Sequence, residues 1–301
     1  MLAPMQLQEI LYSQGFGTRR VCSGLVEQGW VALGEPAQIC RDPWLECEPE
    51  GLVFWVQGQR WTQQRLAYLM LHKPAGYECS QKPGAWPSVY SLLPSPLRQR
   101  PGGAASGVQA VGRLDQDTTG LLLLSDDGAF IHRMASPRHH VPKVYELTCK
   151  HPLQADQIER LLQGVVLDDD PKPVRAAACE AVDAHHLRLT LTEGKYHQVK
   201  RMLAAVGNRV EALHRSRIGP VTLPDDLKAG EWRWLTPEQV QSLQARQSTP
   251  LVAAAHVHPD AICAAAPQAH RLELADCGHS PHRDQPDALT AALTRWLRSL
   301  P

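Results

Sequence analysis

The segment Val111–Gly120, VGRLDQDTTG, places one arginine and two aspartates among small residues, and the run Leu121–Leu124 follows it directly. Four consecutive leucines between charged and small residues are typical of a strand that is buried on both faces. The preceding segment is then a loop held by a rigid strand, which is where catalytic groups are often found. Asp115 in this loop is either a turn residue or a catalytic carboxylate, and the nearby Arg113 favours its ionised form.

The regions around this loop predict further strands and two helices. Apolar residues alternate along 66–74, 143–149 and 186–194, which indicates strands. Residues 155–164 and 198–207 have helical spacing, and each segment ends at a glycine. The predicted inward-facing side chains are Ile158, Leu161 and Leu162 in the first helix and Val199, Met202, Leu203 and Val206 in the second. This mixture predicts an α+β domain on a mostly antiparallel sheet.

Changes in composition along the chain predict three regions. Residues 1–60 are expected to form two short helices followed by strands, and this number of residues is too small for a robust domain on its own. The stretch 57–65, QGQRWTQQR, has the composition of a linker to the main domain, residues 61–245. Residues 246–301 are an alanine-rich extension that ends in an amphipathic helix.

Charge and composition leave nucleic-acid binding open. Residues 1–60 carry 4 basic and 7 acidic side chains and residues 61–245 carry 22 and 19, so any basic surface must come from clustering in the fold. The eight cysteines form no CxxC pair, and no apolar run approaches the roughly 20 residues of a membrane span. With no signal peptide in the sequence, we expect a soluble cytoplasmic protein with reduced thiols.

Metal and nucleotide-cofactor sites are not expected. The pairs His139–His140 and His185–His186 lack an accompanying set of ligands with the spacing of a zinc site. The sequence also contains neither a phosphate-binding GxxxxGK[ST] loop nor a dinucleotide-binding glycine motif.

Two further features have both a functional and a structural interpretation. Tyr145 lies on a predicted strand, where an aromatic ring can stack on a nucleobase or, more often, fills the core. The segment Glu193–Met202, EGKYHQVKRM, gathers four basic or titratable side chains at a strand-to-helix junction: Lys195, His197, Lys200 and Arg201. Such a cluster suits phosphate groups, although a solvated helix face is the usual structure of a charged run.

Four stretches, in order, resemble the motifs of the RsuA-type pseudouridine synthases of the ribosomal small subunit. They are LMLHKPAGYECS (69–80), AVGRLDQDTTGLLLLSDDG (110–128), SPRHHVPKVYELT (136–148) and the stretch 193–236, which begins EGKYHQVKRM. A lone GRLD motif would be weak evidence for this family, whereas all four stretches in the family's order are a very specific match. The resemblance runs from about residue 5 to residue 243, and the N-terminal region is similar to the family's S4-type RNA-binding module.

The resemblance implies an enzyme that isomerises uridine to pseudouridine without a metal or a cofactor. It implies that Asp115 is the catalytic aspartate, that Tyr145 stacks on a flipped-out uracil, and that Lys200 pairs with Asp115. Arg113 is implied to contact a phosphate of the flipped nucleotide. The other expected RNA-binding residues are Lys73, Lys143, Lys195, Arg201, Arg19 and Arg20.

The branch of the family that the motifs resemble implies 16S rRNA as the substrate. The implied target lies in the 530-loop region, at position 516 in the usual rRNA numbering, and we expect a monomer that acts on a 30S assembly intermediate. The alternatives are a pseudouridine synthase that acts on 23S rRNA and a non-catalytic rRNA-binding assembly factor.

The extension 246–301 resembles the end of an α/β-hydrolase instead. By that resemblance, His279 would be a catalytic histidine and Asp260 its acid partner. The chain contains no G-x-S-x-G motif, and a histidine and an acid without a nucleophile do not perform acyl transfer. Hydrolase activity is therefore not expected.

Overall fold

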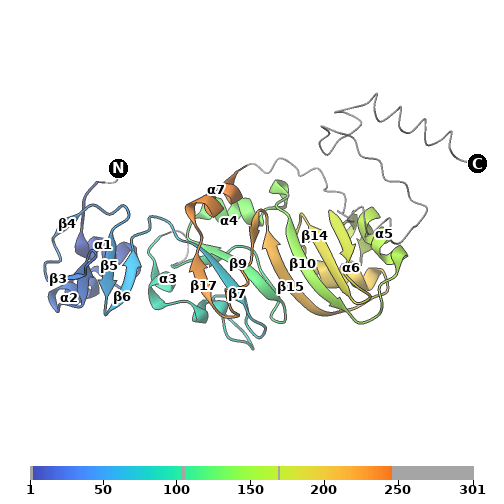
Figure 1. Cartoon of the computed structure of the whole chain (residues 1–301), viewed down its shortest axis with the longest axis horizontal. Coiled ribbons are helices and arrows are strands. Elements are labelled where there is room, and N and C mark those ends of the chain that lie inside the picture. The colour runs from blue at the N-terminus through green and yellow to red at the C-terminus, as the bar shows by residue number, and fades with distance from the viewer. Residues whose placement is uncertain (1–2, 103–105, 169, 246–301) are drawn as a thin grey trace, which may run out of the picture. The chain divides into compact units, whose positions relative to one another are not determined.

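The structure is a computed structural model that describes residues 3–102, 106–168 and 170–245 (Figure 1). The extension 246–301, with His279 and Asp260, lies outside the described residues. Within the described part, seven α-helices accompany a large sheet in which most neighbouring strands are antiparallel. The α+β class predicted from the sequence is therefore confirmed.

The N-terminal region contains two helices and two small antiparallel sheets. Its elements are β1 (Met5–Gln6), α1 (Leu7–Ser13), α2 (Arg19–Glu27), β2 (Val31–Leu33), β3 (Gln38–Cys40), β4 (Glu46–Cys47), β5 (Val53–Val56) and β6 (Gln59–Thr62). Strand β1 pairs with β4, and the other four follow the order β3-β2-β5-β6. Because β6 pairs with β5, the stretch expected to be a linker is partly a strand, and that expectation is wrong there.

Both N-terminal helices pack on the four-stranded sheet. Thr18 begins α2, because its side-chain oxygen accepts a hydrogen bond from the Val21 N–H and satisfies a donor that the helix leaves free. The shared core consists of Leu7, Leu11, Cys22, Val26, Val31, Phe54 and Val56. This core is small and separate from the two cores of the main domain.

A nine-stranded sheet is the scaffold of the main domain. Its strands are β7 (Tyr68–Lys73), β8 (Gln109–Ala110), β9 (Thr119–Ser125), β10 (Lys143–Cys149), β13 (Ala178–Ala181), β14 (His186–Leu191), β15 (Val210–Ile218), β16 (Val221–Thr222) and β17 (Trp232–Trp234). The main path is β13-β14-β10-β15-β9-β7-β17, while β16 pairs with β15 and β8 with β9. Only β9 and β15 run parallel among these described pairs.

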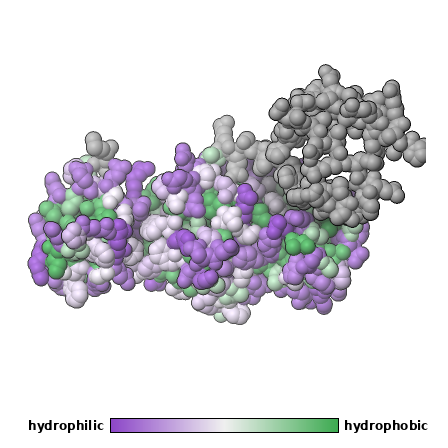
Figure 2. Space-filling view, viewed as in Figure 1, coloured by the Kyte–Doolittle hydropathy of each residue, from purple (hydrophilic) through white to green (hydrophobic). Residues whose placement is uncertain are grey.

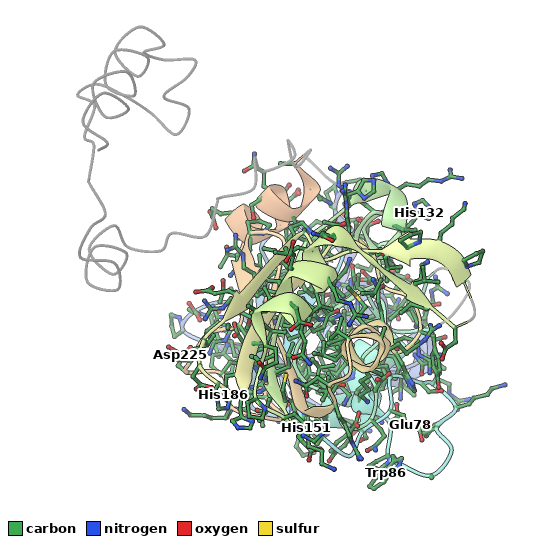
Figure 3. All side chains as sticks on the ribbon, turned by 90° about the vertical axis from the view of Figure 1, so that its right-hand side faces the viewer. Glu78, Trp86, His132, His151, His186 and Asp225 are labelled. Carbon is green, nitrogen blue, oxygen red and sulfur yellow. The ribbon has the colours of Figure 1, made fainter. Side chains whose placement is uncertain are left out.

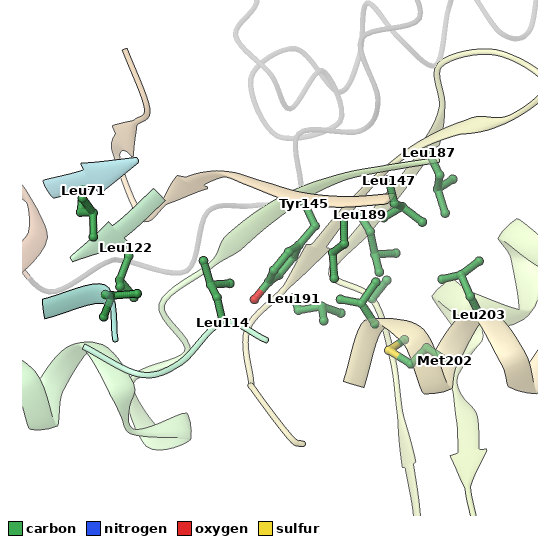
Figure 4. Close-up of a cluster of buried hydrophobic side chains, with 14 of the residues drawn as sticks. Leu71, Leu114, Leu122, Tyr145, Leu147, Leu187, Leu189, Leu191, Met202 and Leu203 are labelled. Atoms are coloured by element: carbon green, nitrogen blue, oxygen red, sulfur yellow. The ribbon is translucent and has the colours of Figure 1, made fainter. Parts of the chain in front are cut away.

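Strand β9 is buried on both faces, which explains its run of leucines. Successive side chains of a strand point to opposite faces, so Leu122 and Leu124 join one core cluster and Leu121 and Leu123 join the other. Figure 4 shows part of the first cluster, which also contains Tyr145. Burying a leucine side chain contributes about 1.5–3 kcal/mol, so β9 is a firm support for the loop before it.

Helices cover both core clusters. They are α3 (Ser95–Gln99), α4 (Gly128–Ala135), α5 (Ala155–Gln163), α6 (Gln198–Ala205) and α7 (Pro237–Gln244). After α5 in the chain, β11 (Val165–Leu167) pairs with β12 (Asp170–Val174) in a separate two-stranded sheet. The stripe predicted for α6 is confirmed, since Val199, Met202, Leu203 and Val206 all join the first cluster. In α5, Leu161 is buried but Leu162 is 40% exposed. The prediction for Leu162 is wrong because consecutive helical residues point about 100° apart.

The visible face of the molecule is mainly hydrophilic, with scattered hydrophobic side chains (Figure 2). Among the described helices, none is both long and apolar enough to span a bilayer.

Candidate active site

Lys73, the last residue of β7, holds the loop that precedes β9. Its Nζ lies within hydrogen-bonding distance of four main-chain carbonyl oxygens, those of Thr118 (2.7 Å), Asp115 (2.9 Å), Pro74 (3.1 Å) and Gln116 (3.3 Å). The side chain is fully buried, and burial lowers the pKa of Lys73. A buried charge is tolerated only where such partners replace water, so this cation fixes the backbone that carries Asp115.

The expectation that Lys73 binds RNA is wrong. Its ammonium group is not accessible to solvent, and the carbonyl groups of the loop already take its three donors. Lys73 is a structural residue of this site.

Gly120 brings strand β15 close to the same loop. Its φ is +108°, and a Cβ atom at this position would lie 2.3 Å from the carbonyl oxygen of Arg215. Only glycine satisfies both the positive φ and the close backbone approach. The parallel register pairs Gly120 with Arg215 and so places β15 directly beside the start of β9.

Asp115 lies beside two basic side chains from the segment Glu193–Met202. Its Oδ2 is 3.1 Å from Lys200 Nζ, and its Oδ1 is 3.3 Å from His197 Nε2. The Asp115 side chain is 28% exposed, so the carboxylate is reachable from outside. The pairing of Asp115 with Lys200 implied by the resemblance is present in the structure.

Lys200 is shared between two carboxylates. Its Nζ donates hydrogen bonds to both oxygens of Asp117, at 2.7 and 2.9 Å, which is closer than to Asp115. Partial burial lowers the pKa of Lys200, but the bonds to Asp117 and Asp115 outweigh it, and the pKa lies above its usual value. Partial burial likewise raises the pKa of Asp117, but Lys200 holds it below the usual value. Asp117 is therefore an ion-pair partner of Lys200 as well as a residue of the loop.

Asp115 opens onto a cavity of about 750 Å³. Pockets of roughly 300–1,000 Å³ hold small-molecule ligands, so a single nucleotide fits here. Six of the ten residues predicted for the site line this cavity: Asp115, Tyr145, Lys200, Arg113, Lys143 and Lys195. The fold therefore gathers residues that are 87 positions apart at the extremes, from Arg113 to Lys200.

Tyr145 combines the two interpretations of its strand position. Its side chain is 8% exposed and belongs to the first core cluster together with Leu114 and Leu191 (Figure 4). It also lines the cavity that contains Asp115. Tyr145 is thus both a core residue and part of the cavity lining.

Two cations, Lys143 and Arg215, lie together in the cavity wall. Arg215 is 3% exposed; its Nε donates to the Leu121 carbonyl oxygen at 2.8 Å, and its Nη2 has no hydrogen-bond partner within the described part of the chain. Burial, and then the charge of Arg215, lower the pKa of Lys143 to about 8. This wall suits an electron-rich group such as a phosphate or a carbonyl oxygen.

The other predicted cations are bound to neighbours or lie elsewhere. Lys195 Nζ is 2.5 Å from Asp170 Oδ2 at the edge of the cavity. Arg201 does not line the cavity and donates to the Tyr196 carbonyl oxygen at 3.1 Å. Arg19 and Arg20 line a separate groove on the N-terminal region.

The residues that line the cavity but were not predicted for the site include Tyr196, His197 and Arg215. The alternation of aromatic and basic residues in KYHQVK is a pattern of nucleic-acid sites and would have indicated the first two. Arg215 is a single arginine on a strand, and no motif in the surrounding sequence marks it as a residue of the site.

A loop after β7 forms another part of the cavity wall. Glu78 lines the cavity and accepts hydrogen bonds from the backbone N–H groups of Gly84 and Trp86, which lower its pKa. Glu78 and Trp86 lie near each other at one edge of the domain (Figure 3). Within the described ranges, no group of three or more His, Cys, Asp or Glu residues is arranged to hold a metal ion.

Comparisons with known proteins agree with this geometry. Residues 67–205 match the RNA pseudouridylate synthase family. A ribosomal small subunit pseudouridine synthase A of Escherichia coli (strain K12) is 39% identical over 239 residues, which cover 79% of this chain and all of the relative. The Yersinia pestis protein of the same name is 47% identical over 178 residues, or 59% of this chain and 73% of the relative.

One crystal structure of a pseudouridylate synthase matches with a TM-score of 0.55 and 33% identity, over 79% of this chain and 99% of the solved chain. Fold, cavity and relatives together define an RNA-modifying isomerase. The chain belongs to the RNA pseudouridylate synthase family, in the group whose curated members are named ribosomal small subunit pseudouridine synthase A. It is a pseudouridine synthase, and the family expected from the sequence motifs is confirmed.

Proposed function

We propose that this pseudouridine synthase isomerises one specific uridine of 16S rRNA, with Asp115 as the catalytic carboxylate. The observation that supports this most strongly is the placement of Asp115 at the cavity, on a loop clamped by Lys73 and next to Lys200. A carboxylate beside a cation stays ionised at neutral pH. An ionised carboxylate can act as a nucleophile or as a base.

The reaction rearranges bonds without changing the atom count. The C1′–N1 bond breaks, the uracil turns, and a C1′–C5 bond forms, while C5 loses a proton and N1 gains one. Asp115 can attack C1′, attack C6, or remove a ribose proton to form a glycal. In each route Lys200 places a positive charge beside the carboxylate, and Asp117 holds Lys200 in place.

The cavity walls supply the contacts that hold a flipped-out nucleotide. A base inside a stacked helix is out of reach of an enzyme, and extruding it costs a few kcal/mol. Tyr145 is proposed to stack on the uracil, and Arg113, exposed at the cavity, to contact a phosphate. Lys143 and Arg215 add positive charge on the same wall.

The names of the relatives support small-subunit rRNA as the substrate. We propose the 530-loop region as the target and a 30S assembly intermediate as the form of RNA that a monomeric enzyme meets. Unstacking is least costly for a base in an exposed loop, and assembly intermediates leave such loops accessible.

Pseudouridine mapping of 16S rRNA tests this proposal. Cells that lack the gene are complemented with the wild type, Asp115→Asn or Asp117→Asn. We expect the modification to return with the wild type and with Asp117→Asn but not with Asp115→Asn. Asp117 is a matched control because it has the same side chain, lies two residues away and pairs with the same lysine.

A different result would contradict each part of the proposal: the catalytic residue, the substrate and the enzymatic activity. Restoration by Asp115→Asn would remove the catalytic role of this residue. An unchanged 16S map together with a lost pseudouridine in 23S rRNA would favour the large-subunit alternative. No lost pseudouridine in either rRNA, combined with defective 30S assembly, would favour a non-catalytic assembly factor.

A further inference from the structure

Tyr196 is unusual among the residues that line the cavity because its side chain is 77% exposed. Its ring is stacked on the imidazole of His197, with the centroids 3.7 Å apart and the planes inclined by 22°. His197 Nε2 is in turn 3.3 Å from Asp115 Oδ1. One face of the Tyr196 ring is therefore covered, and the ring remains largely open to solvent at the cavity.

The backbone around this ring is held firmly. The buried side chain of Gln198 accepts a hydrogen bond from the Lys195 N–H (2.7 Å) and donates one to Glu193 Oε1 (3.0 Å). The Tyr196 carbonyl oxygen accepts a hydrogen bond from Arg201 Nη1 (3.1 Å). A ring presented by a fixed loop loses little conformational entropy when it binds a partner.

A nucleobase is the partner that suits this ring. Tyr196 is a single exposed aromatic residue among basic neighbours, such as Lys195 and Lys200, rather than part of an apolar patch. Aromatic faces next to positive charge are how proteins bind unpaired nucleotides, with bases on the rings and phosphates on the cations. When the target uridine leaves its stack, the bases beside it also lose a stacking partner.

We propose that Tyr196 stacks on the base next to the flipped-out target uridine, so that the Tyr196–His197 pair continues the RNA stack at the cavity. This inference rests on the proposed function, in which the cavity at Asp115 receives the target nucleotide. It assigns Tyr196 a role in binding and in the choice of RNA sequence. That role differs from the one proposed for Tyr145, which contacts the target base itself.

The test uses the full chain and an RNA hairpin that carries the 530-loop sequence. The base on the 5′ or the 3′ side of the target is replaced by 2-aminopurine, whose fluorescence falls when it stacks on an aromatic ring. Tyr196→Ala is compared with Tyr196→Phe, which keeps the ring, and Tyr196→Leu, which keeps apolar bulk without a π face. An Asp115→Asn background allows binding to be measured without chemistry.

We expect the wild-type ring to quench 2-aminopurine at one of the two flanking positions. Tyr196→Ala should lose this quenching and bind the hairpin about 5- to 150-fold more weakly, as the loss of one stacked base implies. Tyr196→Phe should behave like the wild type, and Tyr196→Leu should resemble Tyr196→Ala. Leu162→Ala, at an exposed apolar residue of α5 outside the cavity, should change neither quenching nor affinity.

Two results would contradict the proposed stacking of Tyr196 on a flanking base. One is wild-type quenching at neither flanking position, or quenching that Tyr196→Ala leaves intact. The other is a slower single-turnover rate in Tyr196→Ala at saturating RNA with unchanged affinity, which would mean that Tyr196 acts only through His197 on Asp115. If the hairpin is bound and its 2-aminopurine is quenched as expected, but the wild-type chain never modifies it, the result would count against the proposed substrate. It would not contradict the stacking role of Tyr196.

Discussion

The cavity at Asp115 and the groove on the N-terminal region both contain cations, but only the cavity includes a buried one, since Arg19 and Arg20 in the groove are both exposed. In the groove, Arg19 is exposed; it pairs with Glu9 at 2.6 Å and lies 4.3 Å from the centre of the Tyr12 ring. In the cavity, Arg215 is buried and Lys200 is held by two carboxylates. Charges in a buried setting interact strongly, whereas exposed charges are screened by water and salt.

This difference shows that net charge is a poor guide to where this enzyme contacts RNA. Residues 1–60 carry more acidic than basic side chains, and the main domain is only slightly basic. The strongest candidates for function are single groups whose surroundings the fold determines. The following experiments test that contrast, beginning with the largest expected effect.

Within the cavity, the two aspartates that share Lys200 should differ sharply. Asp115→Asn should lower the single-turnover rate of pseudouridine formation by about 10⁴-fold or more, as the loss of a catalytic nucleophile or base does. Asp117→Asn should lower it by only about 10-fold, because Lys200 keeps its contact with Asp115 and loses one charged hydrogen-bond partner, worth about 1.5 kcal/mol. Equal losses in a quenched-flow assay would mean that the two carboxylates act as one unit.

Two lysines, the buried Lys73 and the half-buried Lys143, should respond in opposite ways to loss of charge. Lys73→Met removes the donor to several loop carbonyl groups and should lower the free energy of unfolding by about 3 kcal/mol, measured in urea. Lys143→Met removes an ammonium group whose pKa burial has already lowered, so stability should stay the same or rise. A similar loss in both variants would show that Lys73 is not a special anchor.

The RNA affinity of the cavity should depend on pH through Lys143. The pKa of about 8 in the folded state lies below that of a free lysine, so the ammonium loses its proton as pH rises through about 8. We therefore expect RNA binding to weaken by about 3- to 10-fold between pH 7 and pH 9. Folding stability should move the other way and rise from about pH 8 upward, because the unfolded chain then binds more protons.

Lys143→Arg is the control for this pH effect, since arginine stays protonated throughout the range. The variant should bind RNA with nearly constant affinity from pH 7 to pH 9 in a fluorescence anisotropy titration. If the affinity of Lys143→Arg for RNA still falls between pH 7 and pH 9, a group other than Lys143 must cause the pH dependence.

The smallest effects are expected in the N-terminal groove. Arg20→Ala should reduce the slope of log affinity against log salt by about 1 if Arg20 contacts a phosphate. Arg19→Ala should change it less, because Glu9 already pairs with Arg19. If Arg19 has the larger effect, the ion pair must open when RNA binds, and the contrast between groove and cavity becomes weaker.

Much of the fold could be predicted because it depends on periodicity. The leucines of β9 and the apolar stripe of α6 follow directly from the alternation of faces in strands and helices. Leu162 was misplaced because it is next to a buried residue, and sequence spacing alone does not set the width of a buried stripe.

The site could be predicted in part. Asp115, Tyr145 and Lys200 meet at the cavity as the motifs imply, although their roles stay predictions. The sequence could not show that Lys73 points into its own protein, because the carbonyl groups it meets lie 42 or more residues later, apart from that of Pro74. The sharing of Lys200 with Asp117 likewise depends on how α6 sits against the loop.

The clamp at Lys73 has a consequence for how far the loop can be redesigned. It recognises main-chain oxygens, which every amino acid supplies, and so it does not depend on the side chains of the loop. The shape of the loop should therefore survive replacement of Asp115 or Gln116. The loop backbone thus provides a fixed position at which other reactive side chains can be substituted one at a time.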